Sequence, residues 1–195
     1  MALEDGGGPL PLLKDRYKEE RRKAKILNFS IAYGKTAYGL SKDWGVSMAE
    51  AEATVGAWYS DRPEVLAWQL DTKDRARRTG SVSTMLGRHR DLPGINTRRL
   101  AGHAERAAIN TPIQGSAADI VMCAMLRVRA DAALARLGFR MVLQVHDEVV
   151  MEGPEEGAEE ALARLVHVME RPFDAPLRVA LTVDGKAVHS WGDAK

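Results

Sequence analysis

A four-residue repeat of cationic and then aromatic side chains marks residues 15–34. The repeat places Arg21, Lys25, Phe29 and Tyr33 four positions apart in an otherwise mixed hydrophobic and polar segment. On a helix each step of four turns the side chain by only about 40°, so the four residues share one face. The pattern predicts a helix that is capped by Asp15 and stops near Gly34.

Helical periodicity continues through most of the remaining chain. Helices are expected over residues 38–44, 48–59 and 63–78, followed by Gly80 as a C-cap. Two short strands, 81–84 and 89–92, should form a hairpin. Residues 100–137 are expected to be helical but interrupted near Pro112 and Gly115, with a capping box of Ser116 and Asp119 restarting the helix.

The pattern changes to strict alternation in residues 138–153. The apolar members are Phe139, Met141, Leu143 and Val145, and a second apolar run covers 149–151. This predicts a strand pair with Asp147 and Glu148 at its tight turn, followed by a helix opened by Pro154. The expected fold class is α+β, mostly helical, with a small antiparallel sheet.

Composition is that of a globular protein with room for one large or two small cores. The chain has 195 residues, 45% of them hydrophobic, and a formal net charge of +1. No apolar run is long enough to span a membrane, so no membrane partner is expected, and residues 1–8 resemble no targeting peptide. A single cysteine, Cys123, excludes an intramolecular disulfide and a cysteine-based zinc site. We expect it to be buried, in a reducing compartment.

Charge is distributed unevenly along the chain. Eight arginines against two acidic residues give residues 75–106 an excess of six positive charges, which attracts polyanions. A solvated helix face explains the arginines at 75–78. Arg88 and Arg90 belong to the expected hairpin, where nucleic-acid contact is the alternative to simple solvation.

The cation-then-aromatic face of residues 21–33 suits a nucleotide. Guanidinium and ammonium groups pair with phosphate oxygens, and aromatic rings stack on bases. The alternative is an ordinary amphipathic helix that exposes cations and buries rings. Against it, Lys18 and Arg21–Lys23 crowd the first turns, where the helix dipole disfavours positive charge and an external anion would offset it.

Two further groups of polar residues have a candidate role. Arg106, Asn110 and Gln114 are spaced by four and form a second polar stripe. Asp147 and Glu148 follow His146 at the expected turn; hard cations such as Mg²⁺ favour one or two carboxylates together with phosphate oxygens. An aspartate in a turn is also explained by its own side-chain hydrogen bonds.

Four segments in this order resemble motifs of family A DNA polymerases, the bacterial polymerase-one type. They are the helix of residues 21–34 and the segments 84–90, 104–115 and 144–148. Residues 11–15 and 28–36 are most similar to the organellar replicative polymerases of plants and algae, which implies a plastid or a mitochondrion. The resemblance implies a loop-like segment at 1–14, a fingers subdomain at 15–79 and a partial palm at 80–195.

The resemblance also implies a role for each candidate residue. The enzyme would be a DNA-directed DNA polymerase, a nucleotidyltransferase of DNA replication and repair, with primer–template DNA and dNTPs as partners. Arg21 and Lys25 would bind the triphosphate, and Lys25 would protonate the pyrophosphate. Phe29 would lie against the sugar, disfavouring nucleotides without a 3′-hydroxyl, and Tyr33 would stack at the templating position. The primer and template contacts would come from Arg88, Arg90, Arg106, Asn110, Gln114 and His146.

The chemistry implied is phosphoryl transfer with two Mg²⁺ ions, Asp147 binding metal and Glu148 supporting it. In the family a second catalytic aspartate precedes the fingers helix, and no such segment precedes Asp15. We therefore expect the isolated chain to be catalytically deficient. The favoured interpretation is a fragment or truncated gene model that lacks the N-terminal part of the polymerase. A non-catalytic DNA-binding remnant and a split-enzyme subunit remain the alternatives.

Two positions depart from the family pattern. His89 stands where arginine is common, so no DNA contact is assigned to it. Ser30 stands beside the aromatic residue where glycine is frequent, with little effect expected on the chemistry. The palm sheet would also lack its earlier strand, which predicts an exposed edge and poor solubility.

Overall fold

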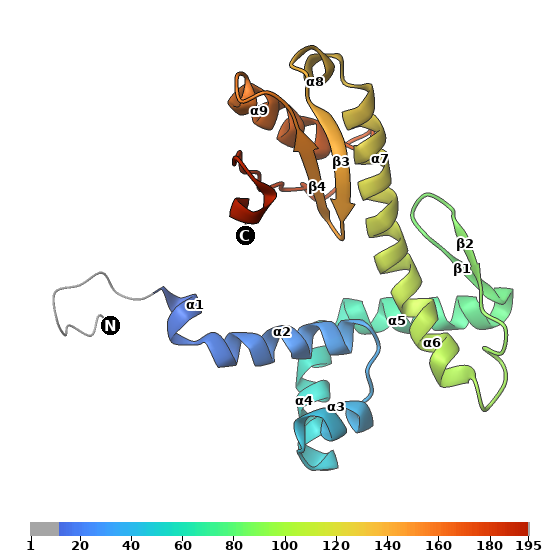
Figure 1. Cartoon of the computed structure of the whole chain (residues 1–195). Coiled ribbons are helices and arrows are strands. Elements are labelled where there is room, and N and C mark those ends of the chain that lie inside the picture. Colours follow the sequence, from blue (N-terminus) through green and yellow to red (C-terminus); the bar gives the residue numbers. More distant parts are fainter. Residues whose placement is uncertain (1–11, 195) are drawn as a thin grey trace, which may run out of the picture. The chain divides into compact units, whose positions relative to one another are not determined.

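The computed structural model describes residues 12–194, which are mostly helical (Figure 1). The helices and strands, in chain order, are α1 (Leu13–Arg16), α2 (Lys18–Ala32), α3 (Ala37–Trp44), α4 (Met48–Ser60), α5 (Pro63–Thr79), β1 (Ser81–Ser83), β2 (His89–Asp91), α6 (Ala101–Asn110), a π-helical turn (Thr111–Gly115), α7 (Ser116–Ala130), α8 (Ala132–Arg136), β3 (Arg140–Val145), β4 (Glu148–Glu152), α9 (Ala158–Met169) and a 3₁₀ turn (Trp191–Ala194). The α+β class expected from the sequence is confirmed. Of the loop-like segment expected at 1–14, residues 1–11 lie outside the described residues, and residues 13 and 14 belong to α1.

The described residues form two compact units. The first unit contains the chain up to Val82 together with His89–Thr111, and the second contains Ser83–Arg88 and the chain from Pro112 onward. No helix in the described part of the chain combines the length and apolar character that crossing a membrane requires.

Local capping interactions set the helix boundaries of the first unit. Ser47 and Glu50 form a reciprocal capping box at the start of α4, and Thr36 accepts the Gly39 N–H at the start of α3. Gly80 ends α5 in the left-handed region, as expected. The cap expected from Asp15 is absent, because Asp15 lies inside α1 and α2 begins after Tyr17 without a side-chain cap.

A small apolar core joins α5, α6 and the β1–β2 pair in the first unit. Its members are Ala76, Val82, Leu92, Ile95, Ala104, Ala107 and Ala108. Alanines dominate the helical contribution, which lets the helix backbones approach closely. The core therefore fixes α6, the helix that carries Arg106 and Asn110.

The second unit is built on the antiparallel hairpin of β3 and β4. Val145 pairs with Glu148, so the two-residue turn consists of His146 and Asp147, and Glu148, expected at the turn with Asp147, is the first residue of β4. The register shifts between Met141 and Leu143, a bulge that the alternation did not predict. Consequently Leu143, expected on the buried face, is 42% exposed.

Helices α7, α8 and α9 supply the core of the second unit. Val128, Leu134, Ala161 and Val168 are buried together, and Phe139 and Met151 from the hairpin pack against them. The hairpin is thereby held against the helices at the end opposite its turn. The turn that carries Asp147 extends away from this core.

Three local expectations for the second unit were wrong. The helix continues from α6 through the π-helical turn into α7 instead of restarting. The expected capping box does not form: Ser116 Oγ accepts the Met85 N–H, and the buried Asp119 pairs with Arg88. Helix α9 begins at Ala158 rather than at Pro154, because Gly157 adopts a left-handed conformation just before it. Cys123 is a free cysteine and only partly buried.

Candidate functional site

The stripe of residues 21–33 forms as predicted on α2. The rings of Phe29 and Tyr33 stack with centroids 6.1 Å apart and planes 12° from parallel. Lys25 Nζ lies 5.7 Å from the Phe29 ring centroid, so cation and rings form one continuous line. Within the described residues, neither Arg21 nor Lys25 has a carboxylate partner, which leaves both free to bind an anion.

A hollow of about 550 Å³ opens beside the aromatic end of this stripe, within the first unit. This size suits a small-molecule ligand. Its lining comes from the C-terminal half of α2, the turn that follows it, the start of α3, and α6. The residues are Phe29, Ser30, Tyr33, Lys35, Thr36, Tyr38, Gly39, Arg106 and Asn110. Four of these residues, Phe29, Tyr33, Arg106 and Asn110, were candidates from the sequence.

Gly34 explains why the end of α2 lies against α6. Its φ is +81°, and a Cβ at this position would sit 2.9 Å from the Cδ1 of Ile109 and 3.8 Å from the Cγ of Arg106. Only glycine combines this backbone conformation with this close approach. The glycine therefore brings the aromatic residues of α2 and the polar residues of α6 to the same hollow.

The hollow contains one buried acceptor that is not satisfied. The Oδ1 of Asn110 is buried and has no hydrogen-bond partner among the described residues. Such a group is costly unless a ligand or water donates to it. Asn110 thus lines the hollow and has a buried acceptor without a donor in the described structure.

Lys35, Thr36 and Tyr38 line the hollow but were not recognised from the sequence. Tyr38 is 62% exposed and Lys35 pairs with Asp43. These residues follow the end of α2 and the Gly34 turn, so helical spacing from Phe29 or Tyr33 does not place them, and only the turn itself could have indicated them.

The two arginines expected to contact nucleic acid differ in their surroundings. Arg88 pairs with the buried carboxylate of Asp119, although its own side chain is 55% exposed. Arg90 donates to Thr111 Oγ1 at 3.0 Å and has no carboxylate partner in the described chain. Arg90 is therefore the freer cation, and Arg88 is held in place by a buried anion.

The hairpin turn displays its polar residues to solvent. His146 has a φ of +55°, the left-handed conformation that a two-residue hairpin turn demands, and its carbonyl accepts from the Gln144 side chain. Asp147 and Glu148 are exposed and form no ion pair in the described part of the chain. Exposed carboxylates without cationic partners are a fitting donor set for a hard divalent cation, which Asp147 and Glu148 would hold.

Residues 12–194 contain no cluster of three or more His, Cys, Asp or Glu side chains that could hold a metal ion. The structure thus gathers the candidates into two sets. Arg21, Lys25, Phe29, Tyr33, Arg90, Arg106 and Asn110 belong to the first unit, and Arg88, Gln114, His146, Asp147 and Glu148 belong to the second.

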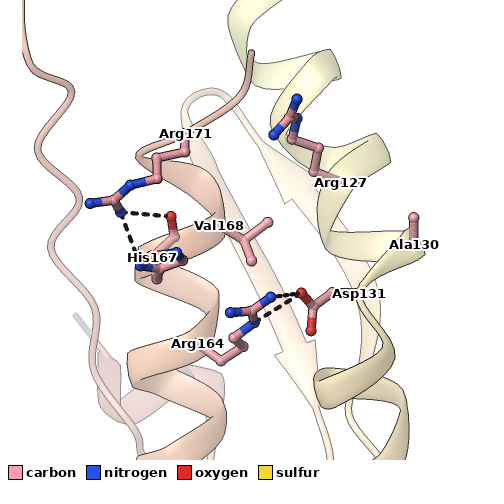
Figure 2. A pocket seen from close by; sticks show the side chains of 7 residues that line it. All are labelled: Arg127, Ala130, Asp131, Arg164, His167, Val168 and Arg171. Atoms are coloured by element: carbon pink, nitrogen blue, oxygen red, sulfur yellow. Dashed lines mark hydrogen bonds and ion pairs between the residues drawn. The ribbon is translucent and has the colours of Figure 1, made fainter. Parts of the chain in front are cut away.

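A second, smaller hollow of about 270 Å³ lies between α9 and the end of α7 (Figure 2). Its cations already have partners. Arg164 donates from Nε and Nη2 to one oxygen of Asp131, Arg171 donates to the carbonyl of His167, and Arg127 pairs with Asp174. We therefore interpret this hollow as an ion-paired junction of helices.

Comparison with known proteins decides the family. The family model for DNA polymerase family A matches residues 12–193. The chain belongs to DNA polymerase family A. DNA polymerase I B, chloroplastic/mitochondrial, from Arabidopsis thaliana is 55% identical to this family A chain over 185 residues, which is 94% of the chain. The thermostable DNA polymerase I of Thermus filiformis is 41% identical over 90% of it.

A solved structure agrees with this assignment. The POL domain of Pol1 from M. smegmatis, in complex with DNA primer-template and dNTP, superposes on 84% of this family A chain with a TM-score of 0.78 and 39% identity. The chain spans 18% of the length of the Arabidopsis relative, 21% of the Thermus relative and 29% of the M. smegmatis chain.

Proposed function

We propose that this chain supplies the nucleotide-binding helix and one catalytic turn of a DNA polymerase that adds dNTPs to a primer 3′-hydroxyl. The observation that carries the proposal is the hollow that gathers Phe29, Tyr33, Arg106 and Asn110 beside a free cationic face. We place the polymerase in plastids or mitochondria, in DNA replication and repair, because the plant relatives are chloroplastic or mitochondrial. The fingers subdomain would cover residues 15–79 and the partial palm residues 80–195.

On the nucleotide side, α2 would bind the incoming dNTP along its length. Arg21 and Lys25 are exposed and have no carboxylate partner among the described residues, so they can bind triphosphate oxygens, and Lys25 can give its proton to the departing pyrophosphate. Phe29 would then contact the sugar and Tyr33 the templating position. Their stacked rings form a flat surface against which a base pair can be matched.

On the DNA side, residues of both units would hold the primer and template. Arg106 and Gln114 would contact the newest pair, Asn110 would support that contact, and His146 would face the primer end. Arg88 and Arg90 would bind the DNA backbone, for which their exposure on the β1–β2 hairpin is suited.

Asp147 would hold the catalytic Mg²⁺, with Glu148 as a supporting carboxylate. When bound, two such ions lower the barrier by making the primer 3′-hydroxyl a better nucleophile and by neutralising charge on the phosphates. The contribution of Asp147 and Glu148 would be a pair of exposed carboxylates at and beside the hairpin turn.

One carboxylate-bearing turn cannot organise two ions, so the remaining ligands would come from the polymerase segment that carries the family's other catalytic aspartate. We therefore propose that the chain alone binds DNA and dNTPs but is deficient in synthesis. Its partner would be the remaining, N-terminal part of a polymerase.

A complementation experiment tests this proposal. The chain is assayed for Mg²⁺-dependent primer extension alone and after mixing with a polypeptide that contains the rest of a plant organellar family A polymerase. We expect no extension by either part and extension by the mixture. The matched control is Asp147→Asn in the chain, which should abolish extension by the mixture while leaving DNA binding unchanged.

Each other outcome identifies an alternative. Extension by the chain alone would overturn the deficiency. Salt-sensitive DNA binding with no extension in any mixture would favour a non-catalytic remnant. A chain that binds neither DNA nor dNTPs would exclude the proposed function altogether.

A further inference from the structure

Gln69 of α5 is a buried polar side chain whose NH₂ group makes two hydrogen bonds and whose oxygen accepts one. It is 2% exposed. Its Nε2 donates to the carbonyl of Ile31 at 3.1 Å and to that of Ala32 at 3.0 Å, and its Oε1 accepts the Tyr59 hydroxyl at 2.7 Å. The partners define the orientation of the amide, because two carbonyls require its NH₂ group.

Tyr59 completes this arrangement from α4. Burial raises the pKa of its hydroxyl, an effect that the hydrogen bond to Gln69 partly opposes. The hydroxyl is therefore protonated at neutral pH and acts as a donor. The two carbonyls set the orientation in which the Gln69 NH₂ faces α2, and the hydrogen bond that the Tyr59 hydroxyl donates to the amide oxygen holds the side chain in it.

The two carbonyls that Gln69 satisfies are the last ones of α2. Helix ends leave four carbonyl groups without partners inside the helix, and burying them unpaired is costly. Gly34 N–H also donates to the Ile31 carbonyl, at 2.9 Å, whereas Gln69 provides the described hydrogen bond to the Ala32 carbonyl. Gln69 thus ties the C-terminal end of α2 to α5, one residue before Tyr33.

Helix α2 has few other attachments. Ile31 is its only buried residue, and the Trp58 Nε1–H donates to Asn28 Oδ1 at 2.7 Å. Both lie in the C-terminal half. The direction of the helix end, and with it the placement of the Phe29 and Tyr33 rings beside the hollow, therefore depends strongly on Gln69.

We propose that Gln69, held by Tyr59, is a positioning residue that sets the affinity of the site for the nucleoside part of a dNTP. The inference rests on the proposed function, since it assumes that α2 binds a nucleotide. Gln69 touches no ligand itself. It acts on the aromatic end of α2, whereas Arg21 and Lys25 at the other end bind phosphate without its help.

Equilibrium binding of two probes to the whole chain separates these effects. The probes are dTTP and inorganic tripolyphosphate, each with excess Mg²⁺, and the variants are Gln69→Leu and Tyr59→Phe. Gln69→Leu leaves the Ala32 carbonyl without its described donor and removes one of two donors to the Ile31 carbonyl. It should weaken dTTP binding about tenfold, and Tyr59→Phe about threefold. Tripolyphosphate binding should change less than about twofold, because the cations of α2 are untouched.

Thr72→Val is the matched control. Thr72 lies on the same helix, is 4% exposed, and its hydroxyl has no hydrogen-bond partner in the described structure, so the variant removes a buried polar group without breaking a described hydrogen bond to α2. Its affinity for both probes should equal that of the wild type. Circular dichroism verifies that each variant is folded, and Tyr59→Phe decides the matter if Gln69→Leu does not fold.

The possible failures are distinguishable. Wild-type protein that binds neither probe overturns the proposed function. Wild-type protein that binds dTTP no better than tripolyphosphate overturns the inference, as does dTTP binding by Gln69→Leu and Tyr59→Phe that equals the control. Equal losses for both probes also overturn it, because they indicate a general loss of structure.

Discussion

Single residues carry the chemistry proposed for this chain, and Asp147 carries the largest share. It lies in the two-residue turn between β3 and β4, exposed and without an ion-pair partner in the described chain. Replacing it with asparagine keeps the size and removes the charge. We expect extension by the complemented polymerase to fall by at least about a hundredfold. Steady-state primer extension measures this.

The control for Asp147 is Glu152→Gln. Glu152 is also an exposed acid of the hairpin, but it pairs with Arg140 at 3.0 Å at the opposite end of the strands. Its loss should leave the extension rate within about twofold, as for a surface ion pair. Equal effects of the two substitutions would show that the hairpin needs negative charge in general.

Phe29 gives a second prediction at this scale. The ring is 49% exposed, so the hydroxyl of Phe29→Tyr fits without repacking. A hydroxyl beside the sugar can replace the hydrogen bond that a missing 3′-hydroxyl would have made. We expect the ratio of dideoxynucleotide to deoxynucleotide incorporation to rise about tenfold, the equivalent of one hydrogen bond. Competition between the two nucleotides in primer extension measures it, and an unchanged ratio would contradict the assignment of Phe29 to the sugar.

Residues differ in how far their roles can be predicted from the sequence. The spacing of Lys25, Phe29 and Tyr33 on one helix was sufficient to predict their contact, because positions four apart on a helix lie above one another. The role of Gln69 was not predictable. Its partners lie 37 and 38 residues earlier in the chain, and no local pattern encodes that distance.

Helices and strands were predicted where local signals agree. Gly80 after an amphipathic run and the alternation around β3 and β4 gave correct elements. The errors arise where tertiary contacts override local chemistry. Asp119 could serve the expected capping box, but it is buried beside Arg88, and the chain passes through a π-helical turn instead of breaking.

Asp131 shows how one residue joins two helices, and it gives a prediction at this scale (Figure 2). Its Oδ1 accepts the N–H groups of Ala133 and Leu134 and so caps α8, while its Oδ2 accepts from Arg164 of α9. The hydrogen bond from Arg164 is the main reason why the pKa of Asp131 lies below its usual value. Asp131→Ala should lower the free energy of unfolding at pH 7 by about 1–2 kcal/mol.

The pH dependence follows from the direction of this shift. Because the pKa of Asp131 is lower in the folded state, its contribution is complete above the unfolded value of about 3.9 and is lost as the pH falls through the folded value. Asp131→Asn retains a capping oxygen but no charge, so it should remove the pH-dependent part only. Urea unfolding at pH 7 and below pH 4 measures the free energy of unfolding of both Asp131 variants. The control is Asp174→Ala, because the Asp174 side chain is fully exposed.

At the scale of the whole molecule, the sequence predicted the family and the fold class, whereas the two compact units of the described structure interleave segments of the chain. The β1–β2 loop, Ser83–Arg88, belongs with the second unit although it lies within the sequence of the first. The reason is contacts of high sequence separation, from Met85 to Ser116 and from Arg88 to Asp119. Such contacts leave no trace in composition or periodicity.

Charge is the other whole-molecule property, and it gives a prediction for the proposed binding of DNA. The net charge of +1 conceals the positive excess of residues 75–106. Each arginine that neutralises a phosphate contributes about one unit to the slope of log affinity against log salt. Arg90→Gln should therefore reduce the slope by about one unit, whereas Arg77→Gln should change it little, because Arg77 already pairs with Asp74 at 3.0 Å and Glu105 at 2.7 Å. Fluorescence anisotropy with a primer–template duplex over a salt series measures both slopes. Equal slopes for the two variants would show that overall charge, rather than Arg90 of the β1–β2 hairpin, determines DNA binding.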